Sequence, residues 1–240
     1  IRDRQDLAQS LTCEVLTDPV SLYLYSTDAS IFQIVPAAVV IPETREQVRQ
    51  AILCASRHGV PILPRGGGTS LAGQTVGPGL VIDCSKHLNR ILEVNSEERW
   101  ARVEPGVVLD QVNDSLRPYG LFFAPDVATS SRANIGGMIG NNSSGTRSVL
   151  YGKTVDHVLE LSTVLAGGDE VVFGPLDPPT LERKCRQEDR EGEIYRAVMS
   201  IVEKNRELIR TRYPKVMRRV SGYNLDELIG DYPLNFAKLL

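Results

Sequence analysis

Residues 64–74 read PRGGGTSLAGQ, a stretch with four glycines, two hydroxyl side chains, one arginine and no acid. Glycine loses more backbone freedom on folding than any other residue, so the three consecutive glycines at 66–68 require a physical reason. Either the chain turns sharply at this point, or another group comes very close to its backbone.

Two further segments share this chemistry. Residues 125–145 read PDVATSSRANIGGMIGNNSSG and residues 151–154 read YGKT, so both are rich in Gly, Ser, Thr or Asn and poor in acids. Backbone N–H groups in a glycine-rich turn can point together into a concavity that binds anions, and a helix N-terminus adds a positive end. Arg65 is the only full charge in the first loop. The pattern therefore predicts a diphosphate held mainly by amides and hydroxyls.

Two common nucleotide motifs do not fit these segments. The GKT at 152–154 resembles the end of a P-loop, but Gly145 leaves six intervening residues where four are needed. The VDHVLEL that follows reads as a strand rather than a helix. No GxGxxG follows a strand, and GGMIG has no acid at the distance required to hold a ribose. The sequence thus argues against a P-loop nucleotidase and against a Rossmann dinucleotide site.

Periodicity predicts a small α/β unit followed by a larger α+β unit with antiparallel hairpins and flanking helices. The helix in the first unit has Thr44 as its N-cap, Gln47 to close a capping box, and Gly59 as its stop. The AGGD turn at 166–169 marks a hairpin. The predicted elements are strand–helix–strand over 37–67, a strand at 79–85, hairpins at 90–108 and 159–173, and helices at 107–120 and 192–214.

Composition narrows the class of protein. The 240 residues carry a net charge of −3, 42% hydrophobic and 24% charged residues, so no bulk basic field attracts nucleic acid. No apolar run approaches the ~18 residues of a transmembrane segment, and the first residues lack a signal peptide. Four scattered cysteines predict reduced thiols in a cytoplasmic protein. The three histidines have no metal-ligand spacing, so no metal site is expected.

The glycine-rich segments carry a family resemblance. PRGGGTSLAGQ resembles the pyrophosphate loop of FAD-linked enzymes of the vanillyl-alcohol-oxidase type, and PDVATSSRANIGGMIGNNSSG…YGKTVDHVLEL resembles their second FAD segment. STDASIFQIVPAAVVIPETREQV, at 26–48, resembles the entry to that domain. The most similar branch contains the large FAD-linked D-2-hydroxy acid dehydrogenases, the glycolate oxidase flavin subunit and D-lactate dehydrogenase.

The resemblance implies an α+β fold, the FAD-binding fold of the p-cresol methylhydroxylase type, with two subdomains. Residues 1–32 would form a lead-in, 33–90 the first FAD subdomain, and 91–240 the second. The apolar ending YPLNFAKLL, at 232–240, predicts that the chain is a fragment lacking a cap domain. No catalytic residue is then expected within it, and the fragment alone should not turn over substrate.

The resemblance also assigns cofactor contacts. The first loop would wrap the pyrophosphate, the second segment would line the ribityl chain and adenosine, and two adjacent glycines would let the isoalloxazine approach the backbone. The implied residues are Arg65, Gly66, Gly67, Gly68, Thr69, Ser70, Gly73, Gln74, Pro125, Asp126, Thr129, Ser130, Gly136, Gly137, Gly140, Asn141, Asn142, Ser144, Gly145, Tyr151, Gly152 and Val158.

Some of these positions have a purely structural alternative. Gly73 and Gly145 could be turn glycines, and Asp126 could only cap the next turn. His157, between valines, reads as a sheet histidine rather than a site residue, and Trp100 reads as a core residue. Some members of the resembling superfamily attach the flavin covalently to a histidine of the first loop. Thr69 occupies the matching position here, so non-covalent FAD is expected.

The resemblance implies oxidation of a small D-2-hydroxy acid, with hydride transfer to FAD and electrons passing to an iron–sulfur region or the quinone pool. Iron–sulfur clusters and a divalent metal would lie in regions outside this chain. The protein would be cytoplasmic, with a possible peripheral position at the inner membrane face. Three alternatives remain: a flavoenzyme similar to the UDP-N-acetylenolpyruvoylglucosamine reductase, a non-catalytic flavin-binding scaffold, and a plain α/β domain without a ligand.

Overall fold

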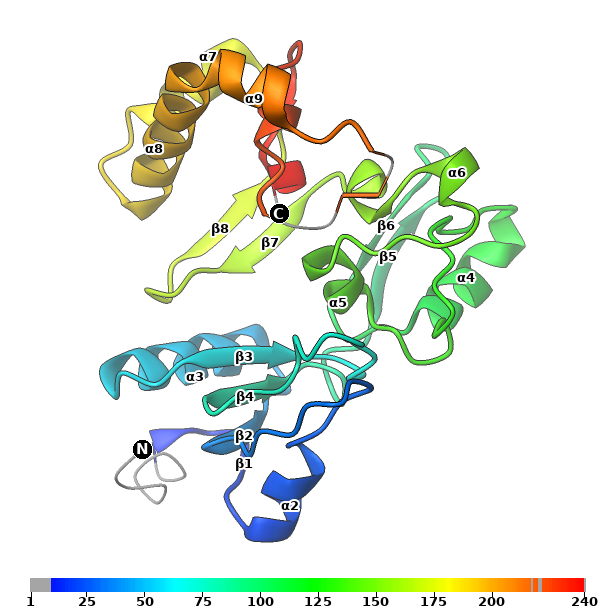
Figure 1. Cartoon of the computed structure of the whole chain (residues 1–240), viewed down its shortest axis with the longest axis vertical. Helices are drawn as coiled ribbons and strands as arrows, with labels where there is room; N and C mark the ends of the chain where they lie inside the picture. Colours follow the sequence, from blue (N-terminus) through cyan, green and yellow to red (C-terminus); the bar gives the residue numbers. More distant parts are fainter. Residues whose placement is uncertain (1–9, 217, 220–221, 240) are drawn as a thin grey trace.

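The structure, a computed structural model, describes residues 10–216, 218–219 and 222–239. Its first unit contains a four-stranded sheet of order β1-β2-β4-β3, in which β2, β4 and β3 are parallel and β1 is an antiparallel edge (Figure 1). Every residue of β2 and β4 is buried, as expected for parallel strands covered on both faces. The strands are β1 (Glu14–Leu16), β2 (Ala38–Ile41), β3 (Ile62–Arg65) and β4 (Leu80–Asp83).

Helices cover the two faces of this sheet. Helix α3 (Arg45–Arg57) packs its apolar side, including Ile52 and Ala55, against alternate residues of β2 and β4. The other alternate residues of these strands pack with Leu22 of α2 (Pro19–Leu24). Because side chains alternate between the faces of a strand, the run AVVI of β2 packs against α3 on one face of the sheet and against α2 on the other.

The predicted capping of α3 is present with one difference. The Thr44 side chain accepts a hydrogen bond from the Gln47 amide at 3.2 Å, as expected for an N-cap. The Gln47 side chain, however, accepts from the amide of Glu43 at 2.6 Å instead of that of Thr44. Gly59 follows the helix with φ of 62°, a left-handed conformation that favours glycine.

The second unit begins with a hairpin and two helices around one apolar cluster. Val112 and Leu116 of α4 pack with Ile135 and Met138 of α5, and partly buried residues of the hairpin close this cluster. The elements are β5 (Ile91–Asn95), β6 (Trp100–Val103), α4 (Leu109–Leu116), the 3-10 helix η1 (Arg117–Tyr119), α5 (Ile135–Gly140), α6 (Ser148–Tyr151) and the 3-10 helix η2 (Thr154–His157).

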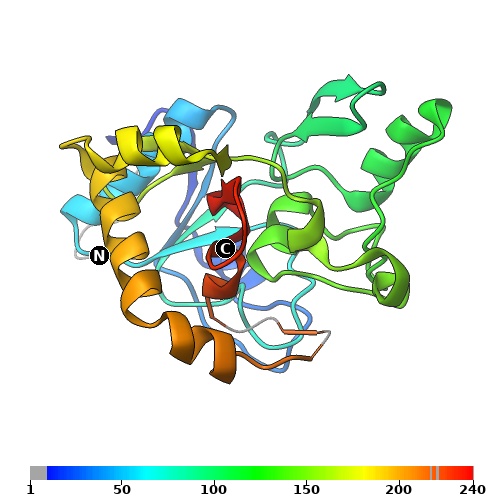
Figure 2. The ribbon, with the colours of Figure 1, turned by 90° about the horizontal axis from the view of Figure 1, so that it is seen from above.

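The rest of the second unit surrounds a separate core centred on Tyr195, which is fully buried between Phe173 and Phe236. Figure 2 shows the C-terminal segment between the long helices and α5, and Leu234 and Phe236 pack in this core. The elements are β7 (Leu161–Val164), β8 (Glu170–Phe173), β9 (Pro175–Leu176), α7 (Pro178–Cys185), α8 (Arg190–Lys204), α9 (Arg206–Arg212), η3 (Leu225–Leu228), β10 (Leu234–Asn235) and η4 (Phe236–Leu239).

Two expectations from periodicity were wrong in detail. The helix predicted over 192–214 is broken at Asn205 into α8 and α9. The Asn205 side chain donates to the Ile201 carbonyl at 2.8 Å, a local bond that competes with the regular helix ladder. Trp100 is only half-buried and its Nε1 donates to Glu98 at 2.7 Å. The ring lies at the surface of the hairpin, where its indole N–H has a hydrogen-bond acceptor.

The mixture of a parallel α/β unit with antiparallel hairpins and helices agrees with the predicted α+β class. Within the predicted lead-in, β1 pairs antiparallel with β2, with Glu14 in register with Ile41. The division at residues 33 and 91 remains a prediction. All four cysteines, Cys13, Cys54, Cys84 and Cys185, are free thiols.

The core around Tyr195 yields a test of stability. Its hydroxyl is buried without a hydrogen-bond partner among the described residues. We expect Tyr195→Ala to lower the free energy of unfolding by about 3–5 kcal/mol, the usual cost of removing a buried aromatic ring. Tyr195→Phe should leave it unchanged or raise it by ~1 kcal/mol, because it removes an unpaired polar group. Urea unfolding followed by circular dichroism measures both, and a large loss in Tyr195→Phe would contradict this account.

Candidate functional site

The first glycine-rich loop leaves the carboxyl end of β3, beside the end of β4 where Arg65 is in register with Asp83. No acceptor among the described residues takes a hydrogen bond from the backbone amides of residues 66–71. Six consecutive unpaired amides in a loop without acids are available to an anion. Backbone amides in folded proteins are usually hydrogen-bonded to other protein groups, to water or to a ligand.

The backbone of this loop lies directly against the second segment. A Cβ on Gly67 would overlap the carbonyl oxygen of Arg132, and a Cβ on Gly66 would lie 2.7 Å from Oδ1 of Asn134. Gly68 has φ of 64°, which favours glycine for a different reason. Glycine is therefore required at 66 and 67 because residues 132–134 come so close to the backbone, and at 68 because of the positive φ.

The two segments also meet through side chains. Gln74 Nε2 donates to Oδ1 of Asn141 at 3.4 Å. Gly73 has φ of 77°, and a Cβ there would lie 2.7 Å from the ring of Phe32. The structure thus brings residues 65–74 and residues 132–141 side by side, although they belong to different units.

Helix α5 carries three glycines of two kinds. A Cβ on Gly136 would lie 2.6 Å from Cβ of Pro105, and the Gly136 amide donates to the Pro105 carbonyl at 2.8 Å. Around Gly137 and Gly140, in contrast, no described atom lies within 4 Å of the Cβ position. Residues three apart share a helix face, so these two form an open strip. Gly136 has a structural role, and the open strip can receive a flat ligand.

Asn134, directly before α5, was not among the predicted site residues. It is 5% exposed, and its Nδ2 donates to the Gly106 carbonyl at 2.5 Å. Its Oδ1 has no hydrogen-bond partner among the described residues and faces Gly66. The preference of Asn for helix N-caps could have drawn attention to it, but only the fold shows its contact with the first loop.

Several predicted residues of the second segment shape the loop. Asp126 accepts from the Arg147 amide at 2.8 Å, and a Cβ on Gly145 would overlap the backbone of Asp126. Asn142 is 6% exposed with φ of 42°, and its Oδ1 accepts from the Val155 amide at 3.1 Å. These contacts hold the backbone of the loop in place. Pro125 is buried beside it.

Hydroxyl groups remain available around these segments. Within the described part of the chain, the side chains of Thr69, Thr129, Ser130 and Ser144 form no hydrogen bond. The Ser70 hydroxyl accepts only a long bond of 3.4 Å from the Ala72 amide. Hydroxyls can donate or accept as a ligand requires, so they complement the unpaired amides of the first loop.

The third predicted segment is less open. The Tyr151 ring is 41% exposed and lies edge-on to Phe122 at 5.6 Å. Gly152 has φ of 83°, and Val158 is buried in the core around Tyr195. His157 lies in η2 instead of a sheet, and its Nε2 donates to the Tyr151 carbonyl at 2.8 Å. It is a satisfied structural histidine, as expected, but in a 3-10 helix.

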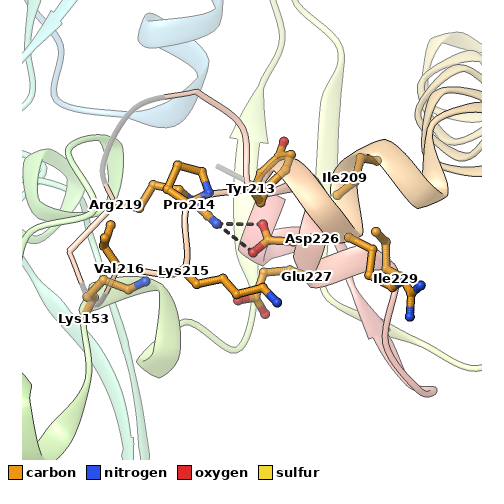
Figure 3. Close-up of a pocket in the computed structure, with 11 residues that line it drawn as sticks. Lys153, Ile209, Tyr213, Pro214, Lys215, Val216, Arg219, Asp226, Glu227 and Ile229 are labelled. Carbon is orange, nitrogen blue, oxygen red and sulfur yellow. Dashed lines mark hydrogen bonds and ion pairs between the residues drawn. The ribbon is translucent and has the colours of Figure 1, made fainter.

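A pocket of about 440 Å³ lies between Lys153, the segment that follows α9, and the 3-10 helix η3, and its described lining contains no residue of the first loop (Figure 3). Arg219 crosses its wall, pairs with both carboxylate oxygens of Asp226 at 2.8 and 2.6 Å, and stacks on Tyr213 at 4.8 Å. Arg219 also accepts at its carbonyl from Asn142 at 3.3 Å. The pocket wall thus supports the second glycine-rich segment.

No group of three or more His, Cys, Asp or Glu side chains within the described ranges is placed to hold a metal ion. Among the helices that the structure describes, none combines the length and apolar character needed to cross a membrane.

Comparison with known proteins identifies a family and related enzymes. Residues 36–174, more than half of the chain, match the family described as FAD binding domain. D-2-hydroxyglutarate dehydrogenase of Pseudomonas putida is 46% identical over 218 residues, which cover 90% of this chain and 22% of that protein. The glycolate oxidase subunit GlcD of Bacillus subtilis is 40% identical over 154 residues, covering 63% of this chain and 33% of that protein.

A solved structure supports the fold. The structure of p-cresol methylhydroxylase with substrate bound has a TM-score of 0.59 and 23% identity, over 72% of this chain and 36% of that chain. The predicted fold class is therefore confirmed. The chain spans less than a quarter of the length of the Pseudomonas putida relative.

The two kinds of glycine in α5 can be separated by substitution. In the ligand-free chain, Gly136→Ala should destabilise the fold by about 1–3 kcal/mol, because the new methyl group overpacks against Pro105. Gly137→Ala, the matched control one residue along, should stabilise it by ~0.5–1 kcal/mol, since Ala is the better helix former. Thermal unfolding measures both changes, and equal destabilisation by the two variants would refute the distinction.

Proposed function

This chain belongs to the family of FAD binding domains, and on that premise we propose that its glycine-rich segments hold FAD between the two units. The supporting observation is the run of unpaired amides at 66–71 beside a second segment with open glycines and available hydroxyls. A diphosphate needs donors without nearby acids, and a planar ring needs a surface without a Cβ. The residues of these two segments meet both requirements, which supports the proposal.

The pyrophosphate would be held by the amides of Gly66–Ser70 and the hydroxyls of Thr69 and Ser70. The flavin ring would lie along the strip of Gly137 and Gly140, where the Cβ positions are open. Thr129, Ser130 and Ser144 would serve the polar chain of the cofactor. Asp126, Asn142 and Gly145 would hold the loop in shape without direct contact.

We propose that the cofactor is bound without a covalent link. Thr69 occupies the loop position at which flavoproteins of the resembling superfamily can carry a histidine, and its hydroxyl forms no hydrogen bond with any described residue. No cysteine lies in residues 64–74 or 125–158. Retention of FAD would therefore depend on hydrogen bonds and packing.

For the protein that contains this chain, we propose oxidation of a small D-2-hydroxy acid to the 2-oxo acid, with 2-hydroxyglutarate as the first candidate. The names and identities of the relatives support this proposal. Bound FAD supplies the chemistry of accepting a hydride from the substrate carbon. The residues of this chain bind and orient the cofactor, while substrate and metal contacts would come from outside it.

We also propose an electron acceptor and a cellular position. An iron–sulfur region of the same polypeptide or the quinone pool would take the electrons, and the protein would be cytoplasmic or peripheral at the inner membrane face. Both follow from the hydroxy-acid branch that the sequence resembles.

The absorption spectrum of the purified chain, mixed with FAD and desalted, tests cofactor binding. We expect flavin bands that move into the supernatant on acid precipitation, as non-covalent binding requires. Gly137→Ala should fold normally and yet bind FAD about tenfold more weakly, which corresponds to ~1.4 kcal/mol. Flavin that remains in the pellet would refute the non-covalent proposal, and unchanged affinity in Gly137→Ala would refute the placement of the ring.

Substrate oxidation is tested in the longest natural polypeptide that contains this chain. Reduction of an artificial dye should be fastest with D-2-hydroxyglutarate and slower with D-lactate and glycolate. The L enantiomer of 2-hydroxyglutarate serves as the matched control and should be inactive. Bleaching of the flavin by NADPH alone, with no response to any hydroxy acid, would instead favour the reductase alternative.

A further inference from the structure

The chain just before the family match lies against the first glycine-rich loop. We call residues 25–32 the strap. The Ala29 amide donates to the Gly68 carbonyl at 3.0 Å, and the Phe32 ring lies against Gly73. Asp28 Oδ2 accepts from the Thr75 hydroxyl at 2.8 Å and from its amide at 3.4 Å. The strap therefore contacts the loop near its start and at its end.

Arg65 joins the strap to the loop. Its Nη1 donates to the carbonyls of Tyr25 and Thr75, both at 3.0 Å, and its Nη2 donates to the Thr27 carbonyl at 2.7 Å. The guanidinium also lies over the Tyr25 ring at 5.3 Å from its centre. Three of its five N–H donors are thus occupied by backbone oxygens of the strap and of Thr75, so the bonds of the guanidinium that the structure shows hold these segments together.

The strap is anchored to the sheet below. The Tyr25 hydroxyl donates to Oδ2 of Asp83 at 2.6 Å, and Asp83 is 3% exposed. Its other oxygen accepts from the amide and hydroxyl of Ser85, at 2.7 and 2.6 Å. Burial, followed by the bond to Asp83, raises the pKa of Tyr25, so its hydroxyl remains a donor at neutral pH.

The charges around Arg65 argue against attraction as its main role. Burial lowers the pKa of Arg65, and the nearby carboxylates of Asp28 and Asp83 oppose this shift by favouring its charged form. A carboxylate beside an anion-binding loop would weaken phosphate binding through repulsion. The position of Asp28 is explained by its hydrogen bonds to Thr75, which hold the strap against the end of the first loop.

We propose that Arg65 and Asp28 are positioning residues: they hold the strap against the loop and so fix the direction of its unpaired amides, without contacting the phosphates themselves. This inference rests on the proposed binding of FAD and changes the role that sequence resemblance implied for Arg65. It also makes residues 25–32, outside the family match at 36–174, part of the site.

The test uses the 240-residue chain and three conservative variants. Arg65→Lys keeps the charge but cannot reach three carbonyls. Asp28→Asn keeps the shape and removes the negative charge, and Thr75→Val removes the hydroxyl without changing charge. Arg49→Lys is the matched control, because Arg49 lies on α3 and bonds to the Gly168 carbonyl and Glu46. Two quantities are measured: hydrogen exchange of the Ala29 amide without FAD, and the Kd for FAD.

We expect Ala29 to exchange about tenfold faster in Arg65→Lys and Asp28→Asn, because loss of the clamp lets the strap open locally. The Kd for FAD should rise about tenfold in all three variants, while Arg49→Lys matches the parent. The double variant Asp28→Asn with Thr75→Val should bind no more weakly than the weaker single variant, since both remove one interaction.

Other outcomes overturn the proposal. Parental affinity in Arg65→Lys, or tighter FAD binding in Asp28→Asn, would show that these residues act through charge. If Arg65→Lys fails to fold, the Kd for FAD of Asp28→Asn and Thr75→Val tests the proposal instead, and parental affinity in both variants would refute it. A parent chain that binds no FAD would refute the proposed function, and unchanged exchange at Ala29 would separately refute the clamp.

Discussion

The contact between the backbone at Gly66–Gly67 and residues 132–134 is the constraint on which the site depends. No side chain fits between the two segments, because a Cβ on Gly67 would overlap the Arg132 carbonyl. The first loop belongs to the α/β unit and its partner to the unit with hairpins. Their close approach therefore fixes how the ends of β3 and α5 face each other, and with them the unpaired amides and the open glycine strip.

The glycines of these segments divide into classes with different physical causes. Gly136 and Gly145 are required by neighbouring protein atoms, whereas Gly68 is required by its positive φ. Gly137 and Gly140 satisfy neither condition, since their surroundings are open. A glycine in a helix costs stability relative to alanine, so an open glycine without a structural cause points to a ligand. This distinction, more than glycine content, supports the cofactor surface that we propose.

The polar groups around the loop also fall into two classes: those that bond to other protein groups and those that remain available to a ligand. Arg65 donates to the Thr27 carbonyl, Asp28 accepts from the Thr75 hydroxyl, and Asp83 accepts from the Tyr25 hydroxyl. Polar networks of this kind fix the geometry of the segments that they join. Among the residues that the structure describes, none is a hydrogen-bond partner of the amides of 66–71 or of the Thr69 hydroxyl. Rigid support beneath unpaired donors is the arrangement expected of a preorganised anion site, because little order is then lost on binding.

The sequence alone determined the local elements and the kind of ligand. Thr44 and Gly59 marked the ends of α3, AGGD marked the turn of β7 and β8, and the acid-poor glycine loops indicated a diphosphate. These signals are local, since capping and turn residues act on their own backbone. Periodicity nevertheless predicted one continuous helix over 192–214, where the structure has two helices, α8 and α9, separated at Asn205.

Only the tertiary structure decided which residues face the ligand. Gly136 and Gly137 are adjacent and identical in sequence, and they differ because Pro105, far away in the chain, packs against one of them. The resemblance implied a phosphate contact for Arg65, and only the fold shows that carbonyls of Tyr25, Thr27 and Thr75 occupy three of its five N–H donors. Contacts between distant segments depend on how the units pack together, which the spacing of residues along the chain does not specify.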